Sequence, residues 1–245
     1  MKNVFDNETF FAEYTKLRES DVNYNDLLEQ PAMRALLPQL SGKSVLDIGC
    51  GFGKNCREFL DRGAAKVTGI DISEKMLAAA RKNNAAPNIL YRHLDMGKLA
   101  ALDGTFDVVY SSLAFHYCED FDKLMRDIAA LLNPNGILLF SQEHPLTTAD
   151  GDGHFQYGSD GKADAYILSG YSVSGSRECS WFIDHVEKTH RTFSDIINAL
   201  CGAGLSLDRL CEPVPDASAL EKCPKMYKEF IKPSFLLIKA HKPER

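Results

Sequence analysis

The chain has 245 residues, 44% of them hydrophobic and 25% charged, with a formal net charge of −6, a composition that is typical of a globular protein and excludes a disordered or fibrous one. No apolar run reaches the ~18 residues of a membrane span, and the N-terminal segment MKNVFDNETFFAEY lacks the basic and apolar regions of a signal peptide, so we expect a cytoplasmic protein without a membrane partner. Seven scattered cysteines without a C-x-x-C pair predict reduced thiols and no metal site, and the acidic charge argues against a nucleic-acid partner.

The first part of the chain favours helices. The apolar spacing predicts one helix over residues 6–19 and a second over 25–37, with Asn25 or Asp26 as the cap of the second. Pro31 lies inside the second helix and must occupy its first turn or kink it, because proline has no backbone N–H to donate.

From residue 44 onward, short apolar runs alternate with helical stretches. The predicted strands are Ser44–Ile48, Lys66–Asp71, Asn88–His93, Thr105–Ser111, Ile137–Ser141, Leu205–Cys211 and Ser234–Ala240. The predicted helices between them are residues 54–62, a helix capped by Ser73, residues 120–132 and Phe193–Cys201. This alternation predicts an α/β fold with a doubly wound, seven-stranded and mostly parallel sheet.

The stretch after the fifth strand interrupts this pattern. Residues 144–180 are rich in Gly, Ser, Asp and Thr and show no long apolar period, which predicts a long loop. A loop of that length in a compact domain is usually functional or disordered. We therefore expect a single domain over residues 1–245, with an insertion at 144–190 on the substrate side.

A glycine-rich turn follows the first predicted strand, in the run VLDIGCGFGKN. Such a turn lets a nucleotide approach the backbone closely. Lys54 stands where a dinucleotide fingerprint would place a glycine, and the Asp47 carboxylate before the turn repels a pyrophosphate and attracts a cationic ligand. Asp71 ends the second strand, where an acid accepts hydrogen bonds from ribose hydroxyls or caps the following helix. These features predict a nucleoside site.

The run VLDIGCGFG closely resembles the first motif of class I S-adenosylmethionine-dependent methyltransferases, in particular the small-molecule group often called methyltransferase type 11. The resemblance extends from about Tyr14 to the last strand. It implies a Rossmann-like fold with S-adenosyl-L-methionine as the cofactor and S-adenosyl-L-homocysteine as the product.

The resemblance also implies a set of cofactor-binding positions. They are Tyr14, Arg18, Gly49, Cys50, Gly51, Asp71, Ile72, Met76, Asp95, Met96 and Ser111. The first two would belong to a helical cap formed by residues 1–40, and the turn residues would hold the methionine part through backbone groups. Asp71 would bind the ribose, with apolar side chains after it flanking the adenine. Asp95 and the next backbone N–H would bind the adenine edge, and Ser111 would stand beside the methyl-transfer centre.

His116 and His144 are the candidate catalytic residues, as general bases for an acceptor that carries a proton. Each follows the carboxyl end of a predicted strand, the edge at which an open parallel sheet forms its binding crevice. Each also has a purely structural interpretation, His116 as a satisfied histidine or helix cap and His144 as a turn residue before a proline. Trp181 would either wall an acceptor pocket or anchor the insertion by burial.

These observations predict an S-adenosylmethionine-dependent methyltransferase that acts on a small-molecule acceptor by in-line displacement. The alternatives are a nucleic-acid or protein methyltransferase, an NAD(P)-dependent oxidoreductase and a cofactor-binding protein without catalysis. Lys54 argues against the oxidoreductase, and Ser111–Ala114 lacks the Asn/Asp-Pro-Pro-aromatic run of amino-methylating DNA enzymes. The acceptor, the atom that is methylated and the oligomeric state are left open by the sequence.

Overall fold

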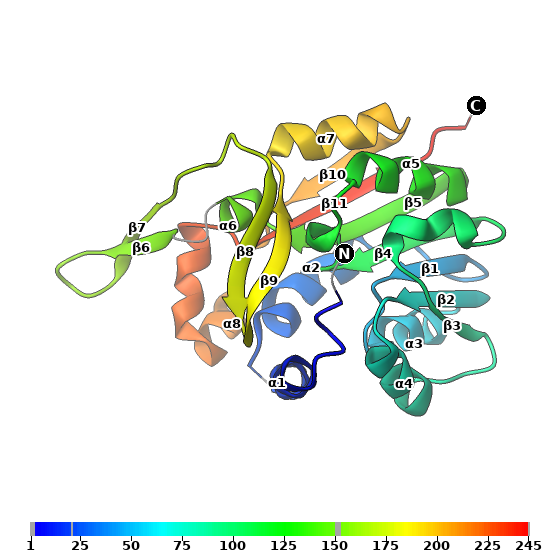
Figure 1. The fold of residues 1–245 in the computed structure, drawn as a ribbon, viewed down its shortest axis with the longest axis horizontal. Coiled ribbons are helices and arrows are strands. Elements are labelled where there is room, and N and C mark those ends of the chain that lie inside the picture. Colours follow the sequence, from blue (N-terminus) through cyan, green and yellow to red (C-terminus); the bar gives the residue numbers. More distant parts are fainter. Residues whose placement is uncertain (1–2, 21, 150–152, 245) are drawn as a thin grey trace.

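A seven-stranded sheet with helices on both faces forms the centre of the molecule (Figure 1). The structure is a computed structural model that describes residues 3–20, 22–149 and 153–244. In spatial order the strands are β10 (Ser206–Cys211), β11 (Phe235–His241), β5 (Leu132–Glu143), β4 (Phe106–Ser112), β1 (Ser44–Ile48), β2 (Lys66–Asp71) and β3 (Ile89–His93). Only β11 runs antiparallel to its neighbours in this sheet, which confirms the predicted fold class.

Helices cover the two faces of the sheet in separate groups. The α-helices are α1 (Glu8–Glu19), α2 (Gln30–Leu36), α3 (Lys54–Asp61), α4 (Glu74–Asn83), α5 (Phe121–Leu131), α6 (Pro145–Thr148), α7 (Phe193–Gly202) and α8 (Ala217–Lys222). Shorter helical turns are η1 (Asn25–Glu29), η2 (Met96–Ala101), η3 (Phe115–Tyr117) and η4 (Pro224–Phe230). One apolar core lies between the sheet and α5 and α7, and a second lies between the sheet and α2, α3, α4 and α8.

The two cores share the strands because side chains alternate along each strand. In β1, Leu46 and Ile48 face the core under α5 and α7, whereas Val45 faces the core under α3. The same alternation in β4 directs Val109 and Val108 to opposite faces. Every central strand is therefore apolar on both sides, which explains the short unbroken hydrophobic runs in the sequence.

The N-terminal helices differ in detail from the prediction. The second predicted helix consists of the π-helical turn η1 followed by α2, and Pro31 occupies the first turn of α2. Capping by Asn25 or Asp26 is wrong, since the side chain of Asn23 accepts the Asp26 N–H at 2.9 Å. The structure also contains α8 and η4 between β10 and β11, for which the sequence pattern made no prediction.

The predicted long loop after β5 is wrong, because this segment forms α6 and two β-hairpins. The hairpin strands are β6 (His154–Tyr157) with β7 (Ala163–Ile167), and β8 (Gly175–Trp181) with β9 (Ile183–His190). In β8, half-buried residues alternate with exposed ones, so the strand contains no continuous apolar run. Figure 1 shows the β6–β7 hairpin projecting from the body, while β8–β9 lies over the strand ends near the N-terminus.

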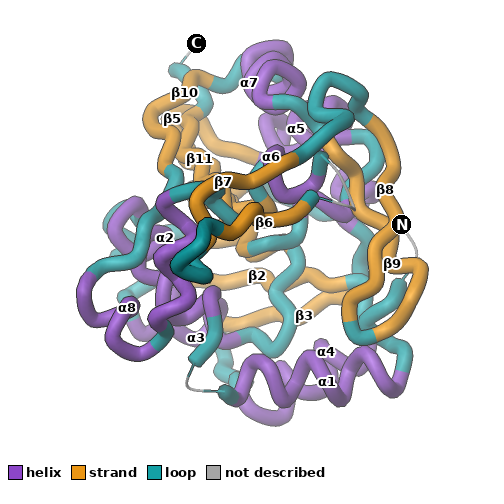
Figure 2. The backbone as a smooth tube through the Cα atoms, turned by 90° about the vertical axis from the view of Figure 1, so that its left-hand side faces the viewer, coloured by secondary structure: helices purple, strands orange, loops and turns teal. Residues whose placement is uncertain are grey.

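The N-terminal segment makes contacts with both α4 and the β8–β9 hairpin. Asp6 accepts the Ser73 hydroxyl at 2.6 Å and the Lys75 N–H at 3.1 Å, at the start of α4. On α1, Phe10 packs edge-on against Trp181 with ring centroids 5.2 Å apart. The Lys75 Nζ of α4 lies 6.0 Å from the centroid of the Phe11 ring on α1. Figure 1 and Figure 2 show both helices at the same end of the molecule. Across the described residues, none of the helices combines the length and the apolar character that a bilayer crossing requires.

Candidate active site

The turn between β1 and α3 is held against β2 by backbone hydrogen bonds. The N–H groups of Gly49 and Cys50 donate to the Ile70 carbonyl at 2.8 and 2.9 Å. The Gly51 N–H donates to the Asp71 carboxylate at 2.8 Å. The turn is therefore a rigid extension of the parallel β1–β2 pair.

Two glycines of this turn have backbone conformations that side chains rarely adopt, with φ of +73° at Gly49 and +51° at Gly51. A Cβ at Gly49 would lie 2.6 Å from the Ala114 side chain, so this position also needs the space. A Cβ at Gly51 would meet nothing within 4 Å. Gly51 therefore leaves open space in front of the turn, where a ligand can approach the backbone.

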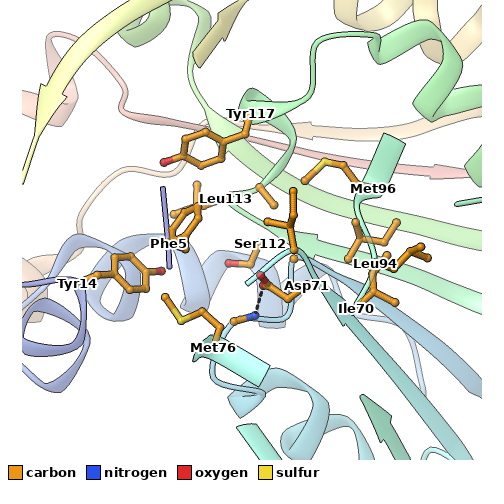
Figure 3. A pocket seen from close by; sticks show the side chains of 15 residues that line it. Phe5, Tyr14, Ile70, Asp71, Met76, Leu94, Met96, Ser112, Leu113 and Tyr117 are labelled. Carbon is orange, nitrogen blue, oxygen red and sulfur yellow. Dashed lines mark hydrogen bonds between the residues drawn. The ribbon is translucent and has the colours of Figure 1, made fainter. Parts of the chain in front are cut away.

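That space belongs to a cavity of about 570 Å³, which we call the loop cavity (Figure 3). It lies at the carboxyl ends of β1, β2 and β4, as predicted for an open parallel sheet. Its walls are mostly apolar, with one acidic side chain among them. The lining residues are Phe5, Tyr14, Ile48, Gly49, Gly51, Ile70, Asp71, Ile72, Met76, Leu94, Met96, Ser112, Leu113, Ala114 and Tyr117.

Asp71 is the acid in the loop cavity, and it is 8% exposed. Its Oδ1 accepts the Ser73 N–H at 2.9 Å, and its Oδ2 accepts the Gly51 N–H at 2.8 Å. Burial raises the pKa of this carboxyl, while these N–H groups oppose the rise. Each carboxylate oxygen keeps a further lone pair, so Asp71 is able to accept two more hydrogen bonds from a vicinal diol. Ser73, and not Asp71, caps α4 by accepting the Met76 N–H.

The structure places several of the predicted cofactor residues around this cavity and others outside it. Tyr14, Ile72, Met76 and Met96 line it. Asp95 does not, and its Oδ1 accepts the Gly97 N–H at 2.8 Å at the start of η2.

The prediction that Ser111 stands beside the methyl-transfer centre is wrong. The Ser111 hydroxyl is fully buried and donates to the Ile48 carbonyl at 2.8 Å, so it does not reach the loop cavity. The next two residues, Ser112 and Leu113, line the cavity instead. Successive strand residues point to opposite faces, so a motif that identifies the strand end correctly is still wrong about the side chain by one residue.

Asp47 and Cys50 lie beneath the turn and do not line the loop cavity. Asp47 is 1% exposed, and its Oδ2 is 3.3 Å from the Cys56 thiol. Burial raises the pKa of Asp47 to about 7. The expectation that this carboxylate attracts a cationic ligand directly is therefore wrong, because the group is walled off from the cavity and only partly ionised near neutral pH.

Arg18 lies one helical turn after Tyr14 on α1 and therefore on the same side of the helix. Its Nη2 is 3.4 Å from Asp26. Its Nη1 is buried and has no hydrogen-bond partner among the described residues. A buried guanidinium nitrogen without a partner is costly, so this donor is available for an anionic group of a ligand.

A second cavity, of about 1320 Å³, adjoins the first and lies under the β8–β9 hairpin; we call it the insertion cavity. The two cavities share Phe5, Tyr14, Leu113 and Tyr117. The other lining residues are Leu17, Asn25, His116, Glu143, Thr147, Thr148, Gly153, Tyr166, Arg177, Glu178, Cys179, Ser180, Trp181, Lys188 and Phe235. Trp181 lines this cavity and also packs against Phe10 on α1.

His116 lines the insertion cavity, and its ring has a defined hydrogen-bonding state. Nδ1 accepts the Glu143 backbone N–H at 3.3 Å. In the neutral ring the proton must then be on Nε2, so His116 offers a donor to the cavity. Burial lowers the pKa of His116 to about 4, which keeps the ring neutral at neutral pH. This state suits a hydrogen-bond donor better than the general base expected from the sequence.

The lowered pKa of His116 makes stability depend on pH. The unfolded state takes up this proton near pH 6.5 and the folded state only near pH 4, so the free energy of unfolding falls as the pH drops through this window. We expect His116→Asn, whose Oδ1 accepts the same N–H, to flatten this fall by up to about 3 kcal/mol. Urea unfolding of both proteins across the window measures the difference, and parallel pH profiles would contradict it.

The prediction that His144 is a catalytic residue is wrong, because His144 lines neither cavity. It is 1% exposed, and both ring nitrogens have partners inside the protein. Nδ1 accepts the Leu146 N–H at 3.1 Å and so caps α6, while Nε2 lies 2.9 Å from Glu212. The structural interpretation of this histidine is therefore the right one, with the ring fixed at the start of the insertion.

A buried ion pair in the insertion cavity was missed by the sequence analysis. Lys188 on β9 lies 2.6 Å from Glu143 at the end of β5, with side chains 13% and 20% exposed. Lys188 also lies over the Trp181 ring, 5.2 Å from its centroid. Burial would raise the pKa of Glu143, but His116 and Lys188 outweigh it and the pKa is lowered. The only local signal was the position of Glu143 after the fifth strand.

A second missed residue, Glu29, supports the loop cavity from behind. Glu29 is fully buried in the π-helical turn η1. Its carboxylate accepts the Ser112 hydroxyl at 2.9 Å, the Gln30 amide at 2.9 Å and also the Ser141 hydroxyl. Burial raises the pKa of Glu29. This network fixes the ends of β4 and β5 relative to the N-terminal helices.

Comparison with known proteins places this chain in a family. A model described as "Methyltransferase domain" matches residues 46–140. A crystal structure of a S-adenosylmethionine dependent methyltransferase from Mesorhizobium loti is 38% identical, with a TM-score of 0.81, and the match covers 87% of this chain and 97% of that chain. The chain belongs to the S-adenosylmethionine-dependent methyltransferases. This methyltransferase therefore uses S-adenosylmethionine as its cofactor, which confirms the predicted enzyme class.

Two further relatives show which parts of the methyltransferase are shared. An uncharacterized protein of Haemophilus influenzae is 41% identical over 99% of this chain and 98% of its own. A malonyl-[acyl-carrier protein] O-methyltransferase of Pectobacterium atrosepticum is 36% identical, but over 48% of this chain and 43% of its own. The first similarity extends over the whole chain, including the insertion, and the second over about half of it.

The shape and the polar groups of the loop cavity fit the methyltransferase cofactor. The open space in front of Gly51 would admit the methionine part, and the free lone pairs of Asp71 match two ribose hydroxyls. The apolar wall that includes Met76 and Met96 suits the adenine ring. Arg18 does not line the loop cavity, but it lies one helical turn after Tyr14, which does, and its unpartnered Nη1 suits a carboxylate.

Proposed function

We propose that this methyltransferase transfers a methyl group to a small-molecule acceptor that binds in the insertion cavity. The observation that carries the proposal is the wall common to both cavities, made of Phe5, Tyr14, Leu113 and Tyr117. Ligands that fill the two cavities would meet at this wall. Alignment of two reactants is worth ~7–11 kcal/mol of the barrier, so such a junction supplies the main requirement of an in-line displacement.

We assign the cofactor contacts to residues of the loop cavity and of α1. Asp71 would bind the ribose, the backbone at Gly49 and Gly51 would approach the methionine part, and Arg18 would hold its carboxylate. Asp95 would reach the adenine edge through its second oxygen. The bound cofactor supplies a methyl group that is already activated by a sulfonium, so the protein's task is to orient the acceptor.

The N-terminal segment and the β8–β9 hairpin would close the site against water. Phe5 contacts Phe10, Tyr14 and Tyr117 through edge-on ring pairs with centroids 5.0 to 5.8 Å apart. Figure 3 shows Tyr14 and Tyr117 approaching Phe5 from two sides of the loop cavity. An aromatic roof of this kind excludes water, which strengthens the electrostatic contacts inside the site.

The shape and lining of the insertion cavity support a small molecule as the acceptor. The cavity has about 1320 Å³ and is lined by side chains of α1, η3 and the β8–β9 hairpin. Binding sites for small molecules are concave and mostly apolar, with a few polar groups that set orientation. His116 and Lys188 are such groups in this cavity.

The test is to incubate the enzyme with S-adenosylmethionine that carries a labelled methyl group and a cell extract separated into low-mass, nucleic-acid and protein fractions. We expect the label in the low-mass fraction. Label in RNA, DNA or protein alone would overturn the proposal. Calorimetry with S-adenosylhomocysteine serves as the control that the preparation binds its cofactor product.

A further inference from the structure

We propose that the acceptor carries a carboxylate, and that Lys188 and the Nε2–H of His116 bind this carboxylate in the insertion cavity. The inference rests on the proposed function, because it names the chemical class of the molecule in that cavity. It is carried by the hydrogen-bonding state of the polar groups that line the cavity.

The first donor is His116. Its Nδ1 accepts the Glu143 N–H at 3.3 Å, and the residue is 3% exposed. The proton on Nε2 has no hydrogen-bond partner among the described residues. Nε2 is not among the fully buried atoms that lack a partner, and His116 lines the cavity, so this N–H is accessible to an acceptor atom on a ligand.

The second donor is Lys188. An ammonium group has three N–H bonds, and the contacts in the structure occupy one on Glu143 at 2.6 Å and one over the Trp181 ring. The remaining N–H is available to a ligand. The cation and its partner are both largely buried, so a charge-assisted hydrogen bond to this ammonium is stronger than one at the surface.

Two other polar side chains of the cavity, Arg177 and Ser180, already make hydrogen bonds within the protein. Arg177 donates to the Ala149 carbonyl at 3.0 Å and to the Ser176 carbonyl at 3.1 Å. The hydroxyl of Ser180 donates to Asp184 at 2.6 Å.

Two carboxylates line the cavity, but Glu178 is paired with His185 and its side chain is 57% exposed to solvent. In the buried part of the described lining, the two N–H donors therefore stand against the second carboxylate oxygen of Glu143. A ligand that supplies oxygen acceptors therefore pairs with more of these lining groups than a ligand that supplies hydrogen-bond donors.

An ammonium-bearing acceptor fits the same groups poorly. The Trp181 face, which would otherwise attract a cation, is occupied by Lys188. The charge of Glu143 is compensated by the same lysine. A second cation in this position would meet the Lys188 ammonium at short range, which is unfavourable in a buried site.

The aromatic walls define suitable probes. We choose phenylacetate, phenylacetamide and phenethylamine, which share an aromatic ring and differ in one group: a carboxylate, a neutral amide and an ammonium. Their binding is measured by ligand-observed NMR on the full-length protein saturated with S-adenosylhomocysteine. We expect phenylacetate to bind roughly tenfold or more tightly than either of the other two, because hydrogen bonds to a charged group are the stronger ones.

Variants then test whether Lys188 is the source of the preference for phenylacetate. Lys188→Met should lose the preference for phenylacetate, and Lys188→Arg should restore most of it. Because Lys188→Met leaves Glu143 unpaired, the double variant Lys188→Met with Glu143→Gln is made as well, and it should show the same loss in a folded protein. The matched control is Lys225→Met, an exposed lysine outside both cavities, which should bind all three probes as the unaltered enzyme does.

Equal binding of phenylacetate and phenylacetamide, tightest binding of phenethylamine, or no binding of any probe would each overturn the inference. So would an unchanged preference in the folded double variant. A failure of the proposed function is recognised in a separate experiment. In that case the label from S-adenosylmethionine appears in macromolecules alone, regardless of which probes bind.

Discussion

Replacing Asp71 with alanine is expected to weaken the binding of S-adenosylhomocysteine about 100-fold or more. The carboxylate would lose two hydrogen bonds to ribose hydroxyls, each worth about 1.5–3 kcal/mol when one partner is charged. The Gly51 N–H, 2.8 Å from Asp71, would also lose its acceptor, so the turn would be less well held. Isothermal calorimetry gives the dissociation constant directly.

The controls separate ligand contact from folding. Asp103→Ala changes an exposed aspartate outside the loop cavity and should leave affinity unchanged. Asp71→Asn keeps one oxygen but turns an N–H₂ group toward the N–H of either Gly51 or Ser73, and an intermediate affinity is expected. Unchanged affinity in Asp71→Ala would show that the ribose lies elsewhere.

Replacing Glu29 with alanine is expected to lower the free energy of unfolding by about 3 kcal/mol. The side chain is fully buried, and its removal would leave the donors of Ser112, Ser141 and Gln30 without their acceptor. Unsatisfied buried donors cost about 1–3 kcal/mol each, and rotation of the two hydroxyls to other acceptors would recover part of that. Denaturant unfolding monitored by circular dichroism measures the change.

Glu29 should also affect the cofactor site, because Ser112 lines the loop cavity. We therefore expect a weaker affinity for S-adenosylhomocysteine in Glu29→Ala, at a temperature where the variant is still folded. Glu29→Gln keeps the shape and one acceptor oxygen and should be less destabilised. Glu221→Ala, an exposed glutamate on α8, is the matched control. A Glu29→Ala protein as stable as the parent would disprove the supporting role.

Local sequence was sufficient for the parts of the site whose chemistry is local. The turn after β1 needs a positive φ at Gly49 and Gly51, and both glycines are visible in the sequence. Asp71 could be placed opposite this turn because β1 and β2 pair in parallel and end at the same sheet edge. Short apolar runs located the seven strands of the sheet within a few residues, since both faces of each central strand are buried.

The sequence was less informative where the direction of a side chain decides the outcome. Ser111 and Ser112 are alike in the sequence, but the pleat turns Ser111 to the Ile48 carbonyl and Ser112 to the loop cavity. His116 and His144 occupy similar positions after neighbouring strands, but one lines the insertion cavity and the other caps α6. A motif locates a backbone position, and packing determines where its side chain points.

By itself the sequence determined the α/β fold, the nucleoside site and the family resemblance, because each depends on residues that are close in the chain or on strands that pair in parallel. Only the tertiary structure decided the composition of the insertion cavity. Lys188 and Glu143 are joined across 45 residues, and Glu29 meets Ser141 across 112. Such pairs form because burial of a charge requires a partner, and no local pattern records which partner the fold brings near.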